Sequence, residues 1–230
     1  MTVHAELLAK SRVFAALSPR TQRSIAEKAA LAEFSEHVDL YHQGDPPAPL
    51  FILLSGRVKL YRQSKENCQI LALPVPGDCL GAESLSTGTA SPYSATTLTP
   101  TTAVTLSPEV LQILMDEHPD FQEIFLRLIT DRLKQFVTLV HDLAFRDVTS
   151  RLATVLLARA DSEGQAVEGG VVFDRLLSQQ EFADMVGTAR EVVYRTFKRL
   201  EDDGLINLSR QSILIRDSAA LRAIAQQETR

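Results

Sequence analysis

The clearest pattern in the chain is a stretch, residues 188–200, in which charged and apolar positions repeat with the period of an α-helix. One arc of this predicted helix is polar and the opposite arc is apolar, so it can pack on a core and still offer a charged face to a partner. The polar arc holds Arg190, Glu191, Tyr194, Arg195 and Lys198, and the apolar arc holds Val192, Val193, Thr196, Phe197 and Leu200.

Upstream residues predict a second helix, joined to the first by a short turn. Ser178-Gln-Gln-Glu181 has the pattern of a capping box, which marks a helix start. Gly187 then interrupts the helical pattern, and Thr188-Ala-Arg-Glu191 has the pattern of a second capping box. Helix, glycine turn and helix together predict a helix-turn-helix.

A β-hairpin is predicted directly after this pair of helices. Asp202-Asp-Gly204 is a turn signal, and the alternating run 205–215 is interrupted by Ser209-Arg-Gln-Ser212. A hairpin beside a helix-turn-helix predicts a winged module.

The charged arc has the chemistry that recognises base edges in a DNA major groove. The fork of an arginine matches the O6/N7 edge of guanine, and a carboxylate can accept from the amino group of cytosine. The candidate base-contacting residues are therefore Arg190, Glu191 and Arg195. An amphipathic surface helix whose arginine and glutamate side chains pair with each other stays open as the alternative.

The N-terminal half alternates short apolar runs with turn signals. We expect a helix near residues 7–28, with Ser18-Pro19 as a cap and first turn, and short strands from about residue 30 to residue 106. Strands of this spacing predict a β-sandwich or roll, followed by a short helix over 109–115. The apolar runs include 51–54, 58–61 and 70–73.

A long helix is predicted from His118-Pro119 to about residue 145. Apolar residues recur in it at alternating steps of three and four, which is a heptad seam and favours a parallel two-chain dimer. A helix buried within one chain is the alternative. A two-fold dimer would place two recognition helices about one helical turn apart on DNA. The seam residues are Leu126, Ile129, Leu133, Phe136, Val140 and Leu143.

Asp147 is the predicted cap of the next helix, over 149–160, and residues 161–170 are predicted to form an exposed polar loop. The whole pattern predicts an α+β chain in three parts. These are a β-roll effector-type domain with an N-terminal helix (1–117), a dimerisation helix (118–146) and a winged helix-turn-helix DNA-binding domain (147–230).

Composition narrows the function classes. The chain has 230 residues, 45% hydrophobic and 23% charged, as expected of a globular protein. It has no apolar run long enough to cross a bilayer and no signal-peptide core, so we expect a cytoplasmic protein without membrane partners. The net charge of -5 argues against general affinity for nucleic acid, so DNA binding needs a local basic patch. Candidates for that patch are Arg175, Arg190, Arg195, Lys198, Arg199, Arg210 and Arg216.

The number and spacing of the cysteines and histidines do not favour a metal site, a haem site or a catalytic site. Two cysteines, Cys68 and Cys79, cannot supply a four-cysteine site, and we expect reduced thiols, with redox sensing as the alternative. We therefore predict no cofactor, no metal site and no enzyme activity, because a cupin-like enzyme would need clustered ligands. The histidines, which are scattered, are His4, His37, His42, His118 and His141.

Taken together, the segments resemble the CRP/FNR family of bacterial transcription regulators over nearly the whole chain. The signatures are Leu54-Ser-Gly-Arg-Val-Lys-Leu-Tyr61, Gly77-Asp78 with Gly81 and Glu83, the stretch 143–149 and the stretch 181–205. The resemblance implies a cyclic-nucleotide-binding-like jelly roll, a dimer helix and a DNA-binding module. It also implies double-stranded DNA, a second copy of the chain and RNA polymerase as partners.

For the DNA module, the resemblance implies that Arg190 and Arg195 contact guanines and that Glu191 contacts a cytosine, in a TGTGA-like half-site of a palindrome. Glu191 has a competing role as the acid of the second predicted capping box. Phosphate contacts set register more than sequence. The residues implied for them are Ser178, Gln179, Gln180, Lys198, Ser209 and Arg210.

For the effector pocket, the resemblance implies a site in which the family's phosphate-binding arginine is replaced by Tyr93. A tyrosine offers no charge to a phosphate, so we predict weak or no response to cyclic AMP. DNA binding without any effector, a more apolar effector, and DNA binding that requires haem or another ligand remain alternatives. The implied pocket residues are Gly81, Glu83, Tyr93, Ser94, Phe136 and Val137.

Overall fold

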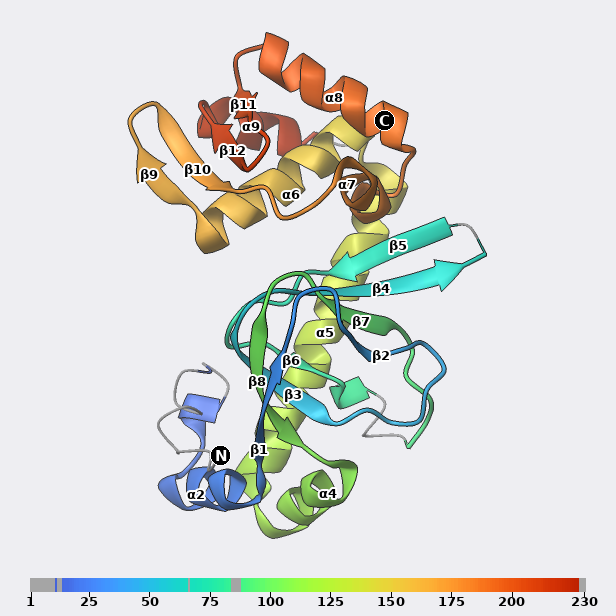
Figure 1. Cartoon of the computed structure of the whole chain (residues 1–230), viewed down its shortest axis with the longest axis vertical. Coiled ribbons are helices and arrows are strands. Elements are labelled where there is room, and N and C mark those ends of the chain that lie inside the picture. The colour runs from blue at the N-terminus through green and yellow to red at the C-terminus, as the bar shows by residue number, and fades with distance from the viewer. Residues whose placement is uncertain (1–10, 12–13, 66, 84–87, 228–230) are drawn as a thin grey trace. The chain divides into compact units, whose positions relative to one another are not determined.

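The computed structural model describes residues 11, 14–65, 67–83 and 88–227, and it divides into two compact units, residues 1–136 and 137–230 (Figure 1). The division falls inside the long helix, so the three-part organisation expected from the sequence stays a prediction. Part of the predicted N-terminal helix, residues 7–10 and 12–13, lies outside the described residues.

The described part of the first unit contains two antiparallel four-stranded sheets together with helices, which confirms the predicted β-roll and the α+β class. One sheet has the strand order β1-β8-β3-β6 and the other has the order β2-β7-β4-β5. The strands are β1 (Ala30–Phe34), β2 (Asp39–Tyr41), β3 (Leu50–Ser55), β4 (Val58–Ser64), β5 (Asn67–Ala72), β6 (Cys79–Leu80), β7 (Ser94–Thr97) and β8 (Thr101–Leu106).

The position of strand β3 between two apolar clusters explains why its sequence is apolar without alternation. Successive side chains of a strand point to opposite faces. Leu50 and Ile52 lie in a cluster shared with the helices, whereas Phe51 and Leu53 lie in a cluster between the two sheets. Both faces of the strand are therefore buried.

The helices of the first unit begin at serine caps followed by proline. Ser18 caps α2 (Pro19–Lys28), as predicted, and Ser107 caps α4 (Pro108–Glu117). In each case the serine hydroxyl accepts a hydrogen bond from a backbone N–H of the first turn, and proline fixes the first helical φ angle. A short 3-10 helix, η1 (Phe14–Ala16), precedes α2.

The long helix α5 (Pro119–Phe145) has the length predicted for it. Leu126, Leu133, Val137 and Val140 on this helix are each more than 60% exposed. Their spacing of seven, four and three residues follows a heptad, and we call these four residues the α5 stripe.

Other residues of the predicted seam are turned inward or are only partly exposed. Ile129 packs on the cluster formed with the helices, and Phe136 packs on the cluster between the sheets, with its ring centroid 6.2 Å from that of Tyr93. Leu143 is half-buried. The exposed apolar surface of α5 therefore includes Val137, which the seam prediction did not contain, and lacks Phe136.

Besides the C-terminal end of α5, the second unit combines four helices with one four-stranded sheet among the described residues, in the order β11-β12-β10-β9. The predicted hairpin is present as β11 and β12, which confirms the wing. After α5, the elements of the second unit are α6 (Val148–Glu163), β9 (Gln165–Val167), β10 (Gly170–Asp174), α7 (Gln179–Val186), α8 (Arg190–Asp202), β11 (Ile206–Leu208), β12 (Ser212–Ile215) and α9 (Ser218–Ala225).

The prediction of a polar loop over residues 161–170 is wrong. Helix α6 continues to Glu163, whose carboxylate pairs with Arg159 one turn earlier at 2.6 Å. Strand β9 then pairs antiparallel with β10, with Gly170 opposite Val167. An ion pair in the last turn of α6 and the pairing of two strands thus order most of a segment whose composition is typical of a loop.

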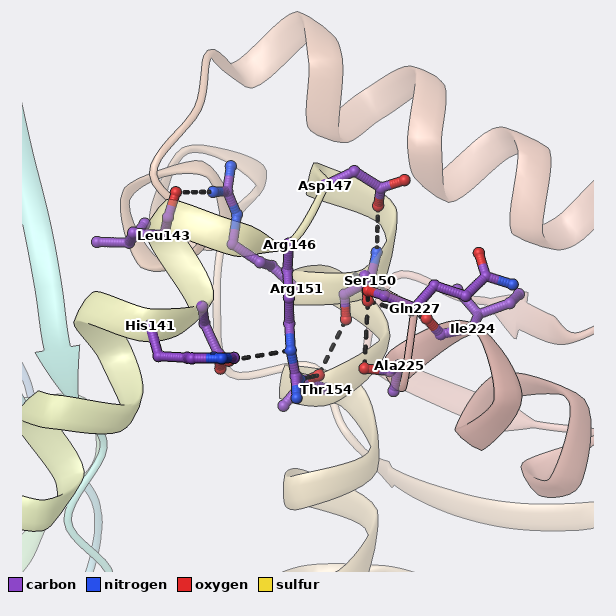
Figure 2. A network of polar contacts seen from close by, with 11 residues as sticks. His141, Leu143, Arg146, Asp147, Ser150, Arg151, Thr154, Ile224, Ala225 and Gln227 are labelled. Atoms are coloured by element: carbon purple, nitrogen blue, oxygen red, sulfur yellow. Dashed lines mark hydrogen bonds and ion pairs between the residues drawn. The ribbon is translucent and has the colours of Figure 1, made fainter. Parts of the chain in front are cut away.

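A polar network surrounds the start of α6 (Figure 2). The Asp147 carboxylate accepts from the backbone N–H of Ser150 at 2.7 Å, which confirms Asp147 as the helix cap. The buried Ser150 hydroxyl lies 2.9 Å from the carbonyl oxygen of Ile224 and 2.8 Å from that of Gln227. The last carbonyl groups of a helix have no intrahelical donor, so Ser150 ties the end of α9 to the start of α6.

The same network joins the end of α5 to α6. Arg146 pairs with Asp142 at 3.1 Å and donates to the hydroxyl of Thr154 at 3.1 Å. Arg151 donates to the carbonyl oxygen of Leu143 at 3.1 Å (Figure 2). The segment between the two helices is therefore held by side chains of both.

In the part of the chain that the structure describes, none of the helices is both long enough and apolar enough to cross a membrane.

The first prediction concerns Ser150. Ser150→Ala removes a buried donor from the terminal carbonyls of α9, and we expect a loss of about 1–3 kcal/mol in the free energy of unfolding. Urea unfolding followed by circular dichroism measures it. The control is Ser162→Ala, because Ser162 is exposed on the same helix and should change stability by less than about 0.5 kcal/mol. Equal midpoints for both variants would contradict the role given to Ser150.

Candidate nucleic-acid interface

Helix α7 begins and ends as the sequence predicts. The Ser178 hydroxyl accepts from the backbone N–H of Glu181, and the Glu181 carboxylate accepts from the backbone N–H of Ser178, which completes the capping box. Gly187 ends the helix in the left-handed conformation, with φ 66° and ψ 54°. A side chain at Gly187 would be strained there, so glycine fixes the turn between the two helices.

The second predicted capping box is wrong. Ala189, and not Thr188, is the N-cap of α8, and it makes no side-chain cap hydrogen bond. The reason lies in the turn, because the backbone N–H of Thr188 donates to the carbonyl oxygen of Ala183 at 3.1 Å and so still belongs to the end of α7. Helix α8 therefore starts one residue later, and Glu191 is released from the capping role.

Helix α8 has the two faces that its sequence predicts. Val193, Phe197 and Leu200 are at most 1% exposed, and the ring of Phe197 meets that of Phe182 on α7 edge-on with centroids 5.1 Å apart. Thr196 is also buried, and Val192 is half-buried. This packing fixes the rotation of α8 about its axis. The exposed residues on the other arc are Arg190, Glu191, Tyr194, Arg195 and Lys198.

The charges on this arc are not paired with one another. The side chains of Arg190, Glu191 and Arg195 have no hydrogen-bond or ion-pair partner among the residues that the structure describes. The alternative of a surface helix whose charges pair with each other therefore loses its main feature. A shallow hollow on this face is lined by Gln179, Arg190, Glu191, Tyr194 and Arg195.

Among the residues implied for phosphate contacts, some side chains already make hydrogen bonds within the chain and others are exposed without an ion-pair partner in its described part. The hydroxyl of Ser209 lies 2.8 Å from that of Ser212 and belongs to the turn of the wing, and Gln180 donates to Asp184 at 2.8 Å. Ser178 is committed to the capping box. Lys198 and Arg210 are exposed, and neither has an ion-pair partner in the described part of the chain.

Arg199, a candidate for the basic patch, makes a contact with Thr149 that the sequence did not predict. The Arg199 guanidinium donates to the hydroxyl of Thr149 in the first turn of α6. A second hollow of the same unit lies between the start of α6 and α8. One feature of the sequence indicates that Arg199 lies near the base-contacting residues. It follows Arg195 by four residues, so the two side chains are neighbours on the helix. The hollow is lined by Asp147, Val148, Thr149, Val192, Arg195, Thr196 and Arg199.

The implied effector region of the first unit is filled by its own side chains. Tyr93 is 2% exposed and packs on the rings of Tyr41 and Phe136, with centroids 6.2 Å away in each case. Burial raises the pKa of both tyrosine hydroxyls far above the ordinary value, so both are neutral. The place of the expected phosphate-binding arginine thus holds a buried aromatic ring.

A buried ion pair adjoins Tyr93. The Arg132 side chain pairs with the Glu83 carboxylate at 3.1 Å and donates to the carbonyl oxygen of Cys79 at 3.0 Å. The Arg132 side chain is 10% exposed and that of Glu83 is 18% exposed. Arg132 was not among the predicted pocket residues, although its i, i+4 spacing from Leu128 and Phe136 places it on the inward face of α5.

The remaining implied pocket residues have structural roles or lie elsewhere. Gly81 has φ 87°, and a Cβ atom there would lie 2.4 Å from the carbonyl oxygen of Pro49. The Ser94 hydroxyl accepts from the backbone N–H of Gln43 at 2.9 Å. Val137 belongs to the second unit and is 61% exposed.

Neither the thiols nor the described metal-ligand residues indicate further chemistry. Cys79 is buried, and desolvation raises the pKa of its thiol far above the ordinary value, which disfavours the reactive thiolate. Cys68 is half-buried and in no disulfide. Within the described ranges, no three histidine, cysteine, aspartate or glutamate residues are arranged to hold a metal ion.

Known protein families match both units. Residues 31–118 match the cyclic nucleotide-binding domain, and residues 150–224 match the Crp-like helix-turn-helix domain. The CRP-like cAMP-activated global transcriptional regulator of Mycobacterium tuberculosis is 30% identical over 217 residues, which cover 94% of this chain and 97% of that protein. The global nitrogen regulator of Synechocystis sp. is 30% identical over 191 residues, or 82% of this chain and 85% of that protein.

Solved structures share the fold. FixK2 from Bradyrhizobium japonicum is 20% identical with a TM-score of 0.77, over 87% of this chain and 99% of that one. A CRP/FNR-family regulator from Thermus thermophilus is 24% identical with a TM-score of 0.74, over 87% of this chain and 100% of that one. The chain belongs to the CRP/FNR family and is a DNA-binding transcription regulator of that type.

Proposed function

We propose that this protein is a homodimeric, sequence-specific transcription regulator that binds a TGTGA-like palindrome and does not depend on cyclic AMP. The observation that supports it most is the exposed, unpaired set of Arg190, Glu191 and Arg195 on a helix whose other face is buried. Two guanidiniums and one carboxylate suit two guanines and a cytosine in one half-site. We expect the protein in the cytoplasm, where bacterial DNA lies, and its contact with RNA polymerase is a proposal from the family alone.

The loss of a capping role for Glu191 strengthens the proposed base contact. A carboxylate engaged in a capping box could not also accept from a cytosine amino group without losing the cap. Glu191 has no partner within the described residues, and it is exposed in the first turn of α8. The N-terminal residues of a recognition helix are those that meet base edges.

Dimerisation is supported by the α5 stripe. Four large aliphatic side chains that are each more than 60% exposed leave apolar surface in water, and a partner of the same kind would cover it. The heptad spacing suits the same helix of a second copy, related by a two-fold axis. A palindromic site requires that symmetry.

Independence from cyclic AMP is supported by the side chains that occupy the effector region. The Mycobacterium tuberculosis relative is named as cAMP-activated. In this chain a cyclic phosphate would meet the neutral ring of Tyr93, and Arg132 is already paired with Glu83. Each missing charge-assisted hydrogen bond removes roughly 1.5–3 kcal/mol of affinity. A regulator that requires haem or another effector is the alternative.

For the base contacts, we predict that Arg190→Ala lowers affinity for the selected specific site by about 1–3 kcal/mol and changes affinity for random DNA far less. The matched control is Lys198→Ala, which removes an exposed cation from the same helix and should weaken binding to both duplexes alike. Fluorescence anisotropy with the two duplexes measures these changes. Equal losses of Arg190→Ala on specific and random DNA would exclude base contact by Arg190.

For the dimer, we predict that Leu133→Asp and Val140→Asp convert the protein to a monomer, because each buries a carboxylate in an apolar interface. Sedimentation velocity at micromolar concentration measures the mass. The control is Thr138→Asp, which adds the same charge to an exposed position nearly opposite Val140 on α5 and should leave a dimer. A wild-type monomer, or stripe variants that stay dimeric, would contradict the proposal.

For the effector, we predict that saturating cyclic AMP leaves the DNA affinity of this protein unchanged. The same anisotropy assay applies, and the Mycobacterium tuberculosis relative serves as the positive control. An increase in DNA affinity with cyclic AMP would overturn this part of the proposal. If ligand-free protein binds poorly and another metabolite or haem restores binding, the effector-dependent alternative is correct.

A further inference from the structure

Tyr194 is a large aromatic residue on the otherwise charged arc of α8. Its side chain is 54% exposed, whereas the aromatic rings of Phe182 and Phe197 in the same module are buried. In the described part of the chain no cation lies over the Tyr194 ring, although such contacts are present at Tyr61 and Phe173. Packing within the chain therefore gives no reason for an exposed phenol ring at this position.

The position places the ring at the centre of the proposed DNA surface. Tyr194 follows Arg190 by four residues and Glu191 by three, so the three side chains share one face. Helix side chains lean toward the N-terminus, which brings the ring over the first turn of α8. It lines the same hollow as Gln179, Arg190, Glu191 and Arg195.

We propose that Tyr194 contributes to sequence specificity by packing its ring on the C5-methyl group of a thymine in the half-site. This inference rests on the proposed function, because it needs α8 in the major groove. The thymine methyl is the apolar group that a major groove offers, and a ring between two arginines is suited to cover it. The contact with the methyl group does not need the phenol hydroxyl, whereas a hydrogen bond from Tyr194 to a phosphate would need it.

The test uses full-length protein and the duplex that wild-type protein selects from a random library. Each thymine of the half-site is replaced in turn by deoxyuridine, which removes only the methyl group. At one position we expect wild-type protein to lose about fourfold in affinity for each half-site replaced, the worth of one buried methyl. Tyr194→Phe should show the same loss, and Tyr194→Ala should bind thymine and deoxyuridine duplexes equally.

The outcomes separate this inference from the proposed function. If Tyr194→Ala remains as sensitive to deoxyuridine as wild type, or if wild type is insensitive at every thymine, the thymine contact is wrong while specific binding stands. If Tyr194→Phe and Tyr194→Ala weaken specific and random DNA equally, Tyr194 contacts phosphate instead. If wild-type protein selects no sequence at all, the proposed function itself fails.

Discussion

The proposed DNA surface depends on the burial of the apolar face of α8. Val193, Phe197 and Leu200 are almost fully removed from water, and the edge-on contact between Phe197 and Phe182 sets the rotation of the helix against α7. With that rotation fixed, the residues at the remaining positions have to face outward. Rotating the helix to bury one of the charged residues instead would lose this apolar packing and leave an unpaired buried charge, which costs several kcal/mol.

A different constraint governs the first unit. In the largely buried pair of Arg132 and Glu83, the guanidinium also donates to the carbonyl oxygen of Cys79, and such an added hydrogen bond offsets part of the desolvation cost of the pair. Tyr93 closes the same region with an aromatic contact to Phe136 on α5. An anionic ligand there would meet this ion pair and a buried ring. This supports the proposal that the protein works without a cyclic nucleotide.

Local patterns in the sequence predicted the winged module well, and the errors arose where backbone hydrogen bonding, and not residue type, decides the structure. The α7 capping box and Gly187 were correct because both act within one turn of chain. The start of α8 was misplaced by one residue because Thr188 completes the preceding helix through Ala183. The hairpin of β9 and β10 was missed because strand pairing, and not composition, orders polar residues.

The α5 helix illustrates a further limit. A heptad pattern predicts that an apolar stripe exists, but two neighbouring stripes fit nearly the same spacing. Packing on the sheets takes Phe136 inward and leaves Val137 outward. The inward position of Arg132 was not predicted, because a charged residue in an amphipathic helix is usually exposed, and its partner Glu83 lies 49 residues away in the sequence.

A salt titration of DNA binding by ligand-free protein on its selected palindrome, with the stoichiometry of the complex measured alongside, tests the proposed dimeric DNA-bound form. We expect two chains per duplex and an affinity that falls steeply with salt, with a slope of about −0.9 for each phosphate neutralised. No binding without an added ligand, a flat salt response, or one chain per duplex would contradict it.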